Sequence, residues 1–293
     1  MILEGKNISK SFDGKIVLDD ISFTLNTGKI YGLVGRNGAG KTTLLKILAR
    51  VLDSDKGETT IDMRDYVAEP SLAKSIAYLP DRFDFFSYVS ALKAMEYYET
   101  IYPNFDRAYV LHEAEKLKLD LKKNIKAQSK GNKTLIGLLM VLATKADFLL
   151  VDETLDGLDV LNKEAIIKYL LDASQDGRCV LISTHQLQEL QGIADEVFYL
   201  GLDGKIQGVD KSKDASFQKV QVVVKEKLPK DILDQAILKN HLGRVYTILL
   251  PGKEEEVVRE LAREEIVQFD ILPLQIEDRF YFERGREKDN ERL

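Results

Sequence analysis

The stretch KIYGLVGRNGAGKTTLLKIL, Lys29–Leu48, decides the fold because it joins three kinds of local structure in one short segment. Its first part, IYGLV, is almost wholly apolar, which is typical of a strand buried in a parallel sheet. GRNGAG follows, and glycine suits a backbone that must turn sharply. In TTLLKILARVL the apolar residues recur at helical spacing. The sequence therefore predicts a strand, a glycine loop and a helix in direct succession.

The glycine loop matches a phosphate-binding pattern. GRNGAGKT, Gly35–Thr42, fits G-x-x-x-x-G-K-[ST] between a strand and a helix, the context that this pattern requires. Its glycines let several N–H groups point inward, and the helix start adds a positive dipole end. We expect Lys41 to reach the β- and γ-phosphates of ATP. The spacing does not match the G-x-G-x-x-G of dinucleotide folds. The expected ATP-binding residues of this segment are Gly35, Asn37, Gly38, Ala39, Gly40, Lys41, Thr42 and Thr43.

A second apolar strand ends in two carboxylates. FLLVDET, Phe148–Thr154, runs straight into Asp152 and Glu153, although the burial of a carboxylate is costly. A bound Mg²⁺ ion and a water molecule beside the nucleotide would explain both acids. We expect Asp152 and the Thr42 hydroxyl to hold Mg²⁺, and Glu153 to polarise the attacking water. The alternative is that both are ordinary surface acids.

The pattern along the chain predicts an α/β fold with a parallel core sheet. Alternating residues near the N-terminus predict an antiparallel β subdomain, and residues of about 85–145 predict an inserted helical subdomain. Strands and helices then alternate, as in a sheet covered on both faces. EVFYLGLDGKIQG, 196–208, is typical of a hairpin with a DG turn. We expect helices over QLQELQGIA, 186–194, and DILDQAIL, 231–238.

Domain boundaries follow from a change of composition. Residues 1–208 are predicted to form one domain, and residues 217–293 a small α+β domain. The polar segment 209–216 is interpreted as a linker. The charged end, ERGREKDNERL, is interpreted as a solvated tail.

Composition limits the possible functions. The chain has 293 residues, of which 44% are apolar. Its formal net charge of -6 argues against a nucleic-acid partner. Cys179 is the sole cysteine, so no intramolecular disulfide forms and a reducing compartment fits. The longest apolar run, LIGLLMVLA, is far shorter than the roughly 20 residues that span a bilayer. We expect neither a signal peptide nor a membrane-crossing helix.

Residues 1–208 resemble the ATP-binding subunits of ABC transporters in the order and spacing of their motifs. The resemblance implies that Phe12 stacks on adenine and that Asp81, in YLPD, lies in the glutamine loop as a possible Mg²⁺ ligand. It places His185, in STH, as the switch histidine that touches the γ-phosphate. A polar residue at the carboxyl end of a parallel strand also faces the ligand crevice. Taken by itself, Phe12 is better interpreted as an ordinary strand aromatic, so its adenine-binding role depends on the resemblance.

The resemblance also assigns residues that act across a dimer. QSKGNK, 128–133, occupies the signature position, so Ser129 and Gly131 would bind the γ-phosphate of ATP held by the other subunit; Ser129 could also simply cap a helix. Asp159, in GLD, falls in the inter-subunit loop. Lys130 stands where the family usually has glycine, and Asp81 where it has glutamine.

The implied function is that of an ATPase that powers transport. The resemblance implies a two-fold dimer with a second copy or a homologous subunit, which sandwiches two ATP molecules. It further implies separate transmembrane permease subunits, and hence a cytoplasmic position on the inner face of the membrane. The signature and helical region resemble peptide or antibiotic exporters. The alternatives are a soluble ABC ATPase that acts on nucleic acid or ribosomes and, less fitting, a P-loop kinase, which has no use for the signature or His185.

Overall fold

A computed structural model describes residues 1–65, 68–190, 192–209, 217–272 and 278. The chain forms two compact units, Met1–Asp210 and Lys211–Leu293, which are treated separately below. All of the predicted linker except Val209, and the whole charged tail 283–293, lie outside the described residues.

A six-stranded sheet forms the centre of the first unit, in the order β10-β9-β3-β8-β7-β6. Neighbouring strands from β9 to β6 run parallel, and β10 pairs antiparallel with β9, as the DG hairpin predicted. The strands β3, β7 and β8 are buried along their whole length, as expected of a parallel sheet covered on both faces. The strands are β3 (Ile30–Val34), β6 (Ile76–Leu79), β7 (Phe148–Asp152), β8 (Cys179–Thr184), β9 (Glu196–Leu200) and β10 (Ile206–Val209).

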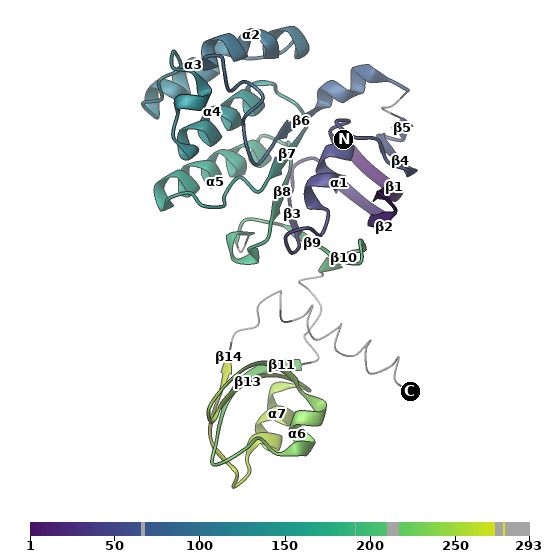
Figure 1. The fold of residues 1–293 in the computed structure, drawn as a ribbon, viewed down its shortest axis with the longest axis vertical. Helices are drawn as coiled ribbons and strands as arrows, with labels where there is room; N and C mark the ends of the chain where they lie inside the picture. Colours follow the sequence, from purple (N-terminus) through teal and green to yellow (C-terminus); the bar gives the residue numbers. More distant parts are fainter. Residues whose placement is uncertain (66–67, 191, 210–216, 273–277, 279–293) are drawn as a thin grey trace. The chain divides into compact units, whose positions relative to one another are not determined.

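A second, antiparallel sheet holds the helix α1 (Lys41–Leu48) against the first. Figure 1 shows α1 between the two sheets, and one apolar core joins Leu3, Leu45 and Phe148 from the three layers. The helix that follows the glycine loop is therefore fixed from both sides. The strands of this sheet, in the order β2-β1-β4-β5, are β1 (Ile2–Phe12), β2 (Lys15–Asn26), β4 (Lys56–Ile61) and β5 (Arg64–Asp65).

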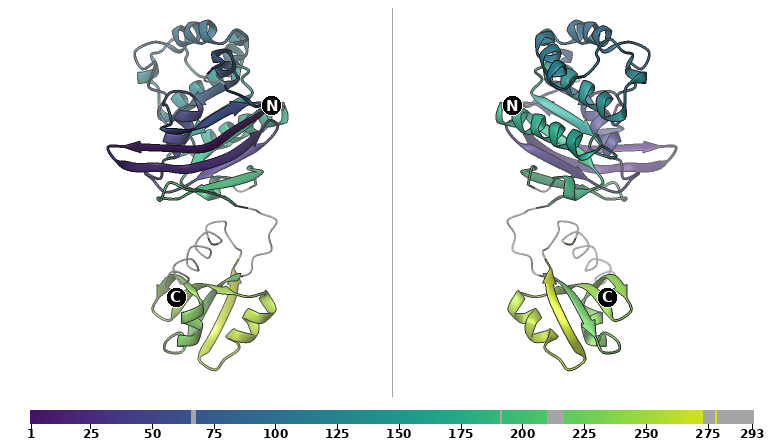
Figure 2. Two further views of the ribbon diagram at one scale, coloured as in Figure 1. Left: turned by 90° about the vertical axis from the view of Figure 1, so that its right-hand side faces the viewer. Right: turned by 90° about the vertical axis from the view of Figure 1, so that its left-hand side faces the viewer.

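The helical part of this unit lies to one side of the sheets (Figure 2). Several of its helices begin at a side chain that accepts a hydrogen bond from the first turn, namely Ser90, Asp106 and Ser129. These caps satisfy N–H groups that have no partner within the helix. The elements are η1 (Pro70–Ser75), α2 (Ala91–Ile101), α3 (Arg107–Lys116), η2 (Ile125–Ala127) and α4 (Lys130–Ala143), and α5 (Val160–Gln175) covers the core sheet. None of the described helices is long and apolar enough to cross a membrane.

Two predicted helices are shorter in the structure than the sequence indicated. In QLQELQGIA the structure has only the short 3₁₀ turn η3 (Leu187–Leu190), and Gly192 soon follows in the left-handed region with φ of 81°. In DILDQAIL, α6 (Lys230–Gln235) ends early and β12 (Ile237–Leu242) begins. Ile237, in the last part of this segment, pairs with Leu249 of the neighbouring strand, so pairing in a sheet outweighs the helical pattern there.

The second unit is a four-stranded antiparallel sheet, in the order β12-β13-β11-β14, with two helices on one face (Figures 1 and 2). Val222 and Ile248 of the sheet pack against Ile232 and Val257 of the helices. The remaining elements are β11 (Phe217–Val224), β13 (Val245–Pro251), α7 (Glu254–Leu261) and β14 (Ile266–Leu272).

The position of α1 between two sheets predicts a large effect of Leu45→Ala. Leu45 is fully buried, so the change removes apolar contacts and leaves a cavity. We expect the free energy of unfolding of the first unit to fall by about 2–5 kcal/mol. Urea-induced unfolding followed by circular dichroism measures this. The control Val51→Ala, at an exposed position, should change it by about 0.5 kcal/mol or less. Equal urea midpoints for both variants would contradict this packing.

Candidate functional site

The candidate site lies at the carboxyl-terminal ends of the strands of the core sheet. The strands β6, β7, β8 and β3 are parallel neighbours, so their carboxyl ends meet there. Asp152 pairs with Ser183 in the ladder, and Val34 pairs with Thr184. The loops that carry the predicted residues leave the sheet from these positions. The edge of an open parallel sheet where the strands end is where ligands bind in such folds.

The glycine loop leaves β3 and needs glycine for two separate reasons. Gly38 and Gly40 have φ of 82° and 104°, a region that other residues rarely adopt. A Cβ atom on Gly35 would lie 2.6 Å from the Leu200 carbonyl oxygen, and one on Gly40 would lie 2.9 Å from Leu18 Cδ2. The loop is therefore pressed against β2 and the end of β9. Beyond it, the first turn of α1 has N–H groups without helical partners, which suit an anion.

Lys41 is the central cation of the site. Its side chain is 3% exposed, and its ammonium donates to the Gly35 carbonyl oxygen at 2.7 Å. The same ammonium lies 2.9 Å from Glu153 Oε1. A buried charge requires such partners because its desolvation is costly. The ion pair joins the glycine loop directly to the acid at the end of β7.

Asp152 is held by two hydroxyl groups. The residue is 1% exposed, and its Oδ1 accepts a hydrogen bond from Ser183 Oγ at 2.6 Å. Its Oδ2 accepts one from the Tyr78 hydroxyl at 3.1 Å. Burial, and then the charge of Asp152, raise the pKa of Tyr78, so that hydroxyl remains a donor. Each carboxylate oxygen keeps a lone pair for a further partner.

The side chain of Glu153 contacts different partners from that of Asp152. Its φ is 43°, in the left-handed region, and its N–H donates to the Ser183 carbonyl oxygen at 3.1 Å. The backbone turns at this residue, so Asp152 meets Tyr78 and Ser183 while Glu153 meets Lys41. A non-glycine residue with positive φ is uncommon and is often found at functional sites.

The donor set suits Mg²⁺ that arrives with a nucleotide. Among the described residues, no group of three or more histidine, cysteine or acidic side chains could hold a metal by itself. Mg²⁺ usually takes one or two carboxylates together with phosphate oxygens and water, and Asp152 with the Thr42 hydroxyl fits that pattern. Asp81 follows β6 at the same edge. Burial is the main cause that raises the pKa of Asp81, and the charge of Glu153 adds to it.

His185 and Phe12 lie at the ends of strands. His185 directly follows β8, and its Nδ1 is buried without a hydrogen-bond partner among the described residues. An unpaired buried nitrogen is costly, which points to a missing partner at this position. Phe12 ends β1 and is exposed, with the Lys10 ammonium 5.5 Å from its ring centroid.

Ser129, Gly131 and Asp159 lie together where α4 and α5 begin. Ser129 Oγ accepts the Asn132 N–H at 3.2 Å, and a Cβ on Gly131 would be 2.4 Å from Asn162 Nδ2. Asp159 caps α5 by accepting the Asn162 N–H at 3.0 Å, a bond that lowers the pKa of Asp159. In the part of the chain that the structure describes, neither Ser129 nor Gly131 bonds to the glycine loop of its own subunit.

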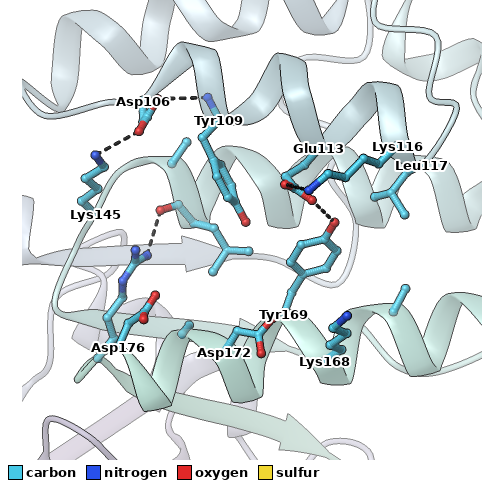
Figure 3. A pocket seen from close by; sticks show the side chains of 15 residues that line it. Asp106, Tyr109, Glu113, Lys116, Leu117, Lys145, Lys168, Tyr169, Asp172 and Asp176 are labelled. Carbon is cyan, nitrogen blue, oxygen red and sulfur yellow. Dashed lines mark hydrogen bonds and ion pairs between the residues drawn. The ribbon is translucent and has the colours of Figure 1, made fainter.

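Two cavities lie in the first unit near these helices. One, of about 490 Å³, is lined mainly by residues of α3 and α5, and Figure 3 shows the ion pairs of Asp106 with Lys145 and of Glu113 with Lys116 in its lining. There the Tyr169 hydroxyl and the Lys116 ammonium each contact Glu113 at 2.7 Å. The other, of about 430 Å³, includes Glu153 and Asp81 in its lining. The second cavity therefore adjoins the acids expected to act in ATP hydrolysis and Mg²⁺ binding.

Two residues that support the site, Tyr78 and Asn162, were not predicted from the sequence. The contact of Tyr78 with Asp152 can be recognised only when β6 is known to lie beside β7, because these two residues are far apart in the chain. Asn162 could have been noticed because it lies three residues after Asp159, a residue type that often caps a helix.

Comparisons with known proteins agree with this geometry. Residues 18–156 match the family described as "ABC transporter". The chain is 26% identical to the ABC transporter ATP-binding protein YtrB of Bacillus subtilis, over 97% of this chain and 98% of YtrB. It is 29% identical to the lipopolysaccharide export system ATP-binding protein LptB of Haemophilus influenzae, over 70% of this chain and 88% of LptB. A ribose import ATP-binding protein is also a relative.

A solved structure shares the fold of the first unit. It is described as the dimeric structure of MJ0796, a bacterial ABC transporter cassette, and it covers 70% of this chain and 96% of its own, with a TM-score of 0.62 at 21% identity. The glycine loop, the paired acids and the relatives thus point the same way. The chain carries an ATP-binding domain of the ABC transporter family, whose members hydrolyse ATP to power transport.

Proposed function

We propose that this chain binds Mg·ATP at the carboxyl-terminal ends of β3, β7 and β8 and hydrolyses it to drive separate transmembrane subunits. The observation that carries the proposal is the contact of Lys41 with both the Gly35 carbonyl and Glu153, directly beside the buried Asp152. Lys41 thereby connects the glycine loop, assigned to phosphate binding, with Glu153, assigned to hydrolysis.

ATP binding is assigned to the glycine loop. N–H groups of the loop and of the first turn of α1 would receive the phosphate oxygens, and Lys41 would exchange Glu153 for the β- and γ-phosphates. That exchange replaces one anionic partner by another, so the ammonium stays matched throughout. Phe12, exposed at the end of β1, would stack on adenine.

Hydrolysis is assigned to Glu153. Once released from Lys41, its carboxylate would take a proton from a water molecule whose oxygen attacks the γ-phosphorus, and the bond to the bridging oxygen of ADP breaks. Thr42 and Asp152, with Asp81 as a further donor, would hold Mg²⁺, which offsets phosphate charge when bound. The unpaired Nδ1 supports a contact of the His185 ring with the γ-phosphate.

The working unit is proposed to be a dimer with a second copy or a homologous subunit. Ser129 and Gly131 lie at a helix start that does not bond to the glycine loop of its own chain. They would complete the site of a partner, with Asp159 in the loop between the subunits. The dimeric description of the MJ0796 cassette is consistent with this arrangement.

The transmembrane subunits would hold the chain on the inner face of the membrane. We propose peptide or antibiotic export as the transported class, on the basis of the SKGNK signature and the YYETIYPNFD helical region. The relatives include both an export and an import protein. A soluble ATPase that acts on nucleic acid or ribosomes is the rival, and the net charge of -6 argues against it. Stimulation of turnover by RNA would favour the rival, whereas co-purification with a multi-span membrane protein supports transport.

Replacement of Lys41 tests the phosphate site. In Lys41→Ala the ammonium contact with the phosphates is lost, and we expect the affinity for Mg·ATP to fall by about 10²-fold. Isothermal titration calorimetry measures the change. Lys46→Ala, in the same helix, is the matched control and should bind normally. Normal ATP affinity of Lys41→Ala would contradict the assignment.

Replacement of Glu153 tests the general base. Glu153→Gln keeps the size of the side chain but cannot accept the proton, so the turnover number should fall by about 10²–10⁴-fold while ATP still binds. Phosphate release assays give the turnover number. Glu164→Gln, an exposed residue on α5, serves as control. Unchanged turnover in Glu153→Gln would remove Glu153 from this role.

The sandwich dimer is tested with the same variant. If two subunits close over ATP, Glu153→Gln should shift from monomer to dimer mass when Mg·ATP is added, because slow hydrolysis preserves the closed form. Light scattering coupled to size exclusion measures the mass. In the Glu153→Gln background, Ser129→Glu should remain monomeric, since the added charge repels the γ-phosphate. If the mass of Glu153→Gln is the same with and without Mg·ATP, the sandwich dimer is contradicted.

A further inference from the structure

Phe12 lies at the tip of the hairpin formed by β1 and β2. It pairs with Lys15 across a two-residue turn, and both residues of that turn have positive φ. On the other side of β1, the ladder with β4 ends at the pair of Ser9 and Lys56, before the last three residues of β1. The ring itself is 43% exposed. An exposed aromatic at such a tip needs a contact outside the ladder to hold it in one place.

Asp55, directly before β4, binds the residues of β1 that precede Phe12. Its N–H donates to the Ser9 carbonyl oxygen at 2.8 Å. Its Oδ2 accepts the Ser11 N–H at 2.7 Å and the Ser11 hydroxyl at 2.8 Å, and its Oδ1 accepts a hydrogen bond from the Lys10 ammonium at 2.7 Å. The bond from Lys10, and then those from Ser11, lower the pKa of Asp55 to about 2, so its carboxylate is ionised at neutral pH. Hydrogen bonds to an ionised group are stronger than those between neutral groups.

The Lys10 ammonium connects Asp55 with the aromatic ring. The Lys10 side chain is 14% exposed, and its ammonium lies over the Phe12 ring, 5.5 Å from the centroid. A cation at this distance is attracted by the face of the ring. Asp55 therefore fixes both the backbone that leads to Phe12 and the cation that lies over one face of it.

The segment that carries Asp55 starts at the end of α1, the helix that follows the glycine loop. The Val51 N–H donates to the Lys46 carbonyl oxygen of α1 at 2.8 Å, and Leu52 packs against the core of the first unit. Residues 49–55 thus lead from the helix of the phosphate site to the strand that carries Phe12. This short path ties the ring to the loop assigned to phosphate.

We propose that Asp55 is a positioning residue for the base of the bound nucleotide. It holds Lys10 and Ser11 so that the Phe12 ring is presented to the base from a fixed backbone. The base would stack on the face of the ring opposite the ammonium. The inference rests on the proposed role of Phe12 and extends it to the residues that hold the ring in place.

Calorimetry with Mg·ADP and with inorganic pyrophosphate separates the base from the phosphates. Both probes occupy the phosphate site, but only ADP carries a base, and neither undergoes the hydrolysis assigned to Glu153. Asp55→Asn keeps the size of the side chain and removes the charge that holds Lys10. We expect the affinity for Mg·ADP to fall about fivefold and that for pyrophosphate to change about twofold or less. Asp53→Asn, at an exposed position in the same segment, is the matched control and should bind both probes normally.

A double variant shows whether Asp55 acts through the ring. Phe12→Ala removes the stacking surface and should lower the affinity for Mg·ADP about tenfold. If Asp55 positions Phe12, adding Asp55→Asn to Phe12→Ala should cost about twofold or less, whereas an independent structural effect of Asp55 would cost the full fivefold, roughly, again.

The outcomes distinguish this inference from the proposed function. A further loss of about fivefold in the double variant would overturn the inference. So would an equal loss for both probes in Asp55→Asn, or normal ADP affinity of Asp55→Asn beside weak binding by Phe12→Ala. Normal ADP affinity of Phe12→Ala would instead remove the adenine role in the proposed function, and this inference with it.

Discussion

The site depends on how one buried ammonium is matched by oxygen atoms. Lys41 lies at the start of α1, in the space between two sheets, where an unmatched charge would be very costly. Its partners come from opposite directions, the Gly35 carbonyl from the loop after β3 and the Glu153 carboxylate from the end of β7. The helix, the loop and the acid are therefore held together through this one ammonium group.

The neighbouring acid is held in a different way. Asp152 is fixed by neutral hydroxyls from the strands on either side, those of Tyr78 and Ser183. Glu153 is instead paired with a cation that ATP is expected to claim. The two adjacent carboxylates thus differ in which of them is free to change partners. This difference follows from the left-handed backbone at Glu153, which sends the two side chains apart.

Much of the first unit could be predicted from local patterns. The apolar strands, the glycine loop and the acids at a strand end are encoded in short segments, and the parallel core sheet confirms that interpretation. Contacts between distant segments could not be predicted in this way. The hydrogen bond from Tyr78 to Asp152 depends on the lateral order of the strands, and β12 depends on pairing with β13. The positions of Asp81 and Lys130 beside one cavity likewise require the folded chain.

The contact of Gly40 with β2 has a mechanical consequence. The backbone of the glycine loop lies so close to Val17 and Leu18 that not even a methyl group fits between them. Tightening of the loop around phosphate would therefore move the hairpin of β1 and β2, whose turn lies nearby and carries Phe12. One short stretch of hairpin would then respond to both ends of a bound nucleotide, because it packs against the loop assigned to the triphosphate and carries the aromatic ring assigned to the base.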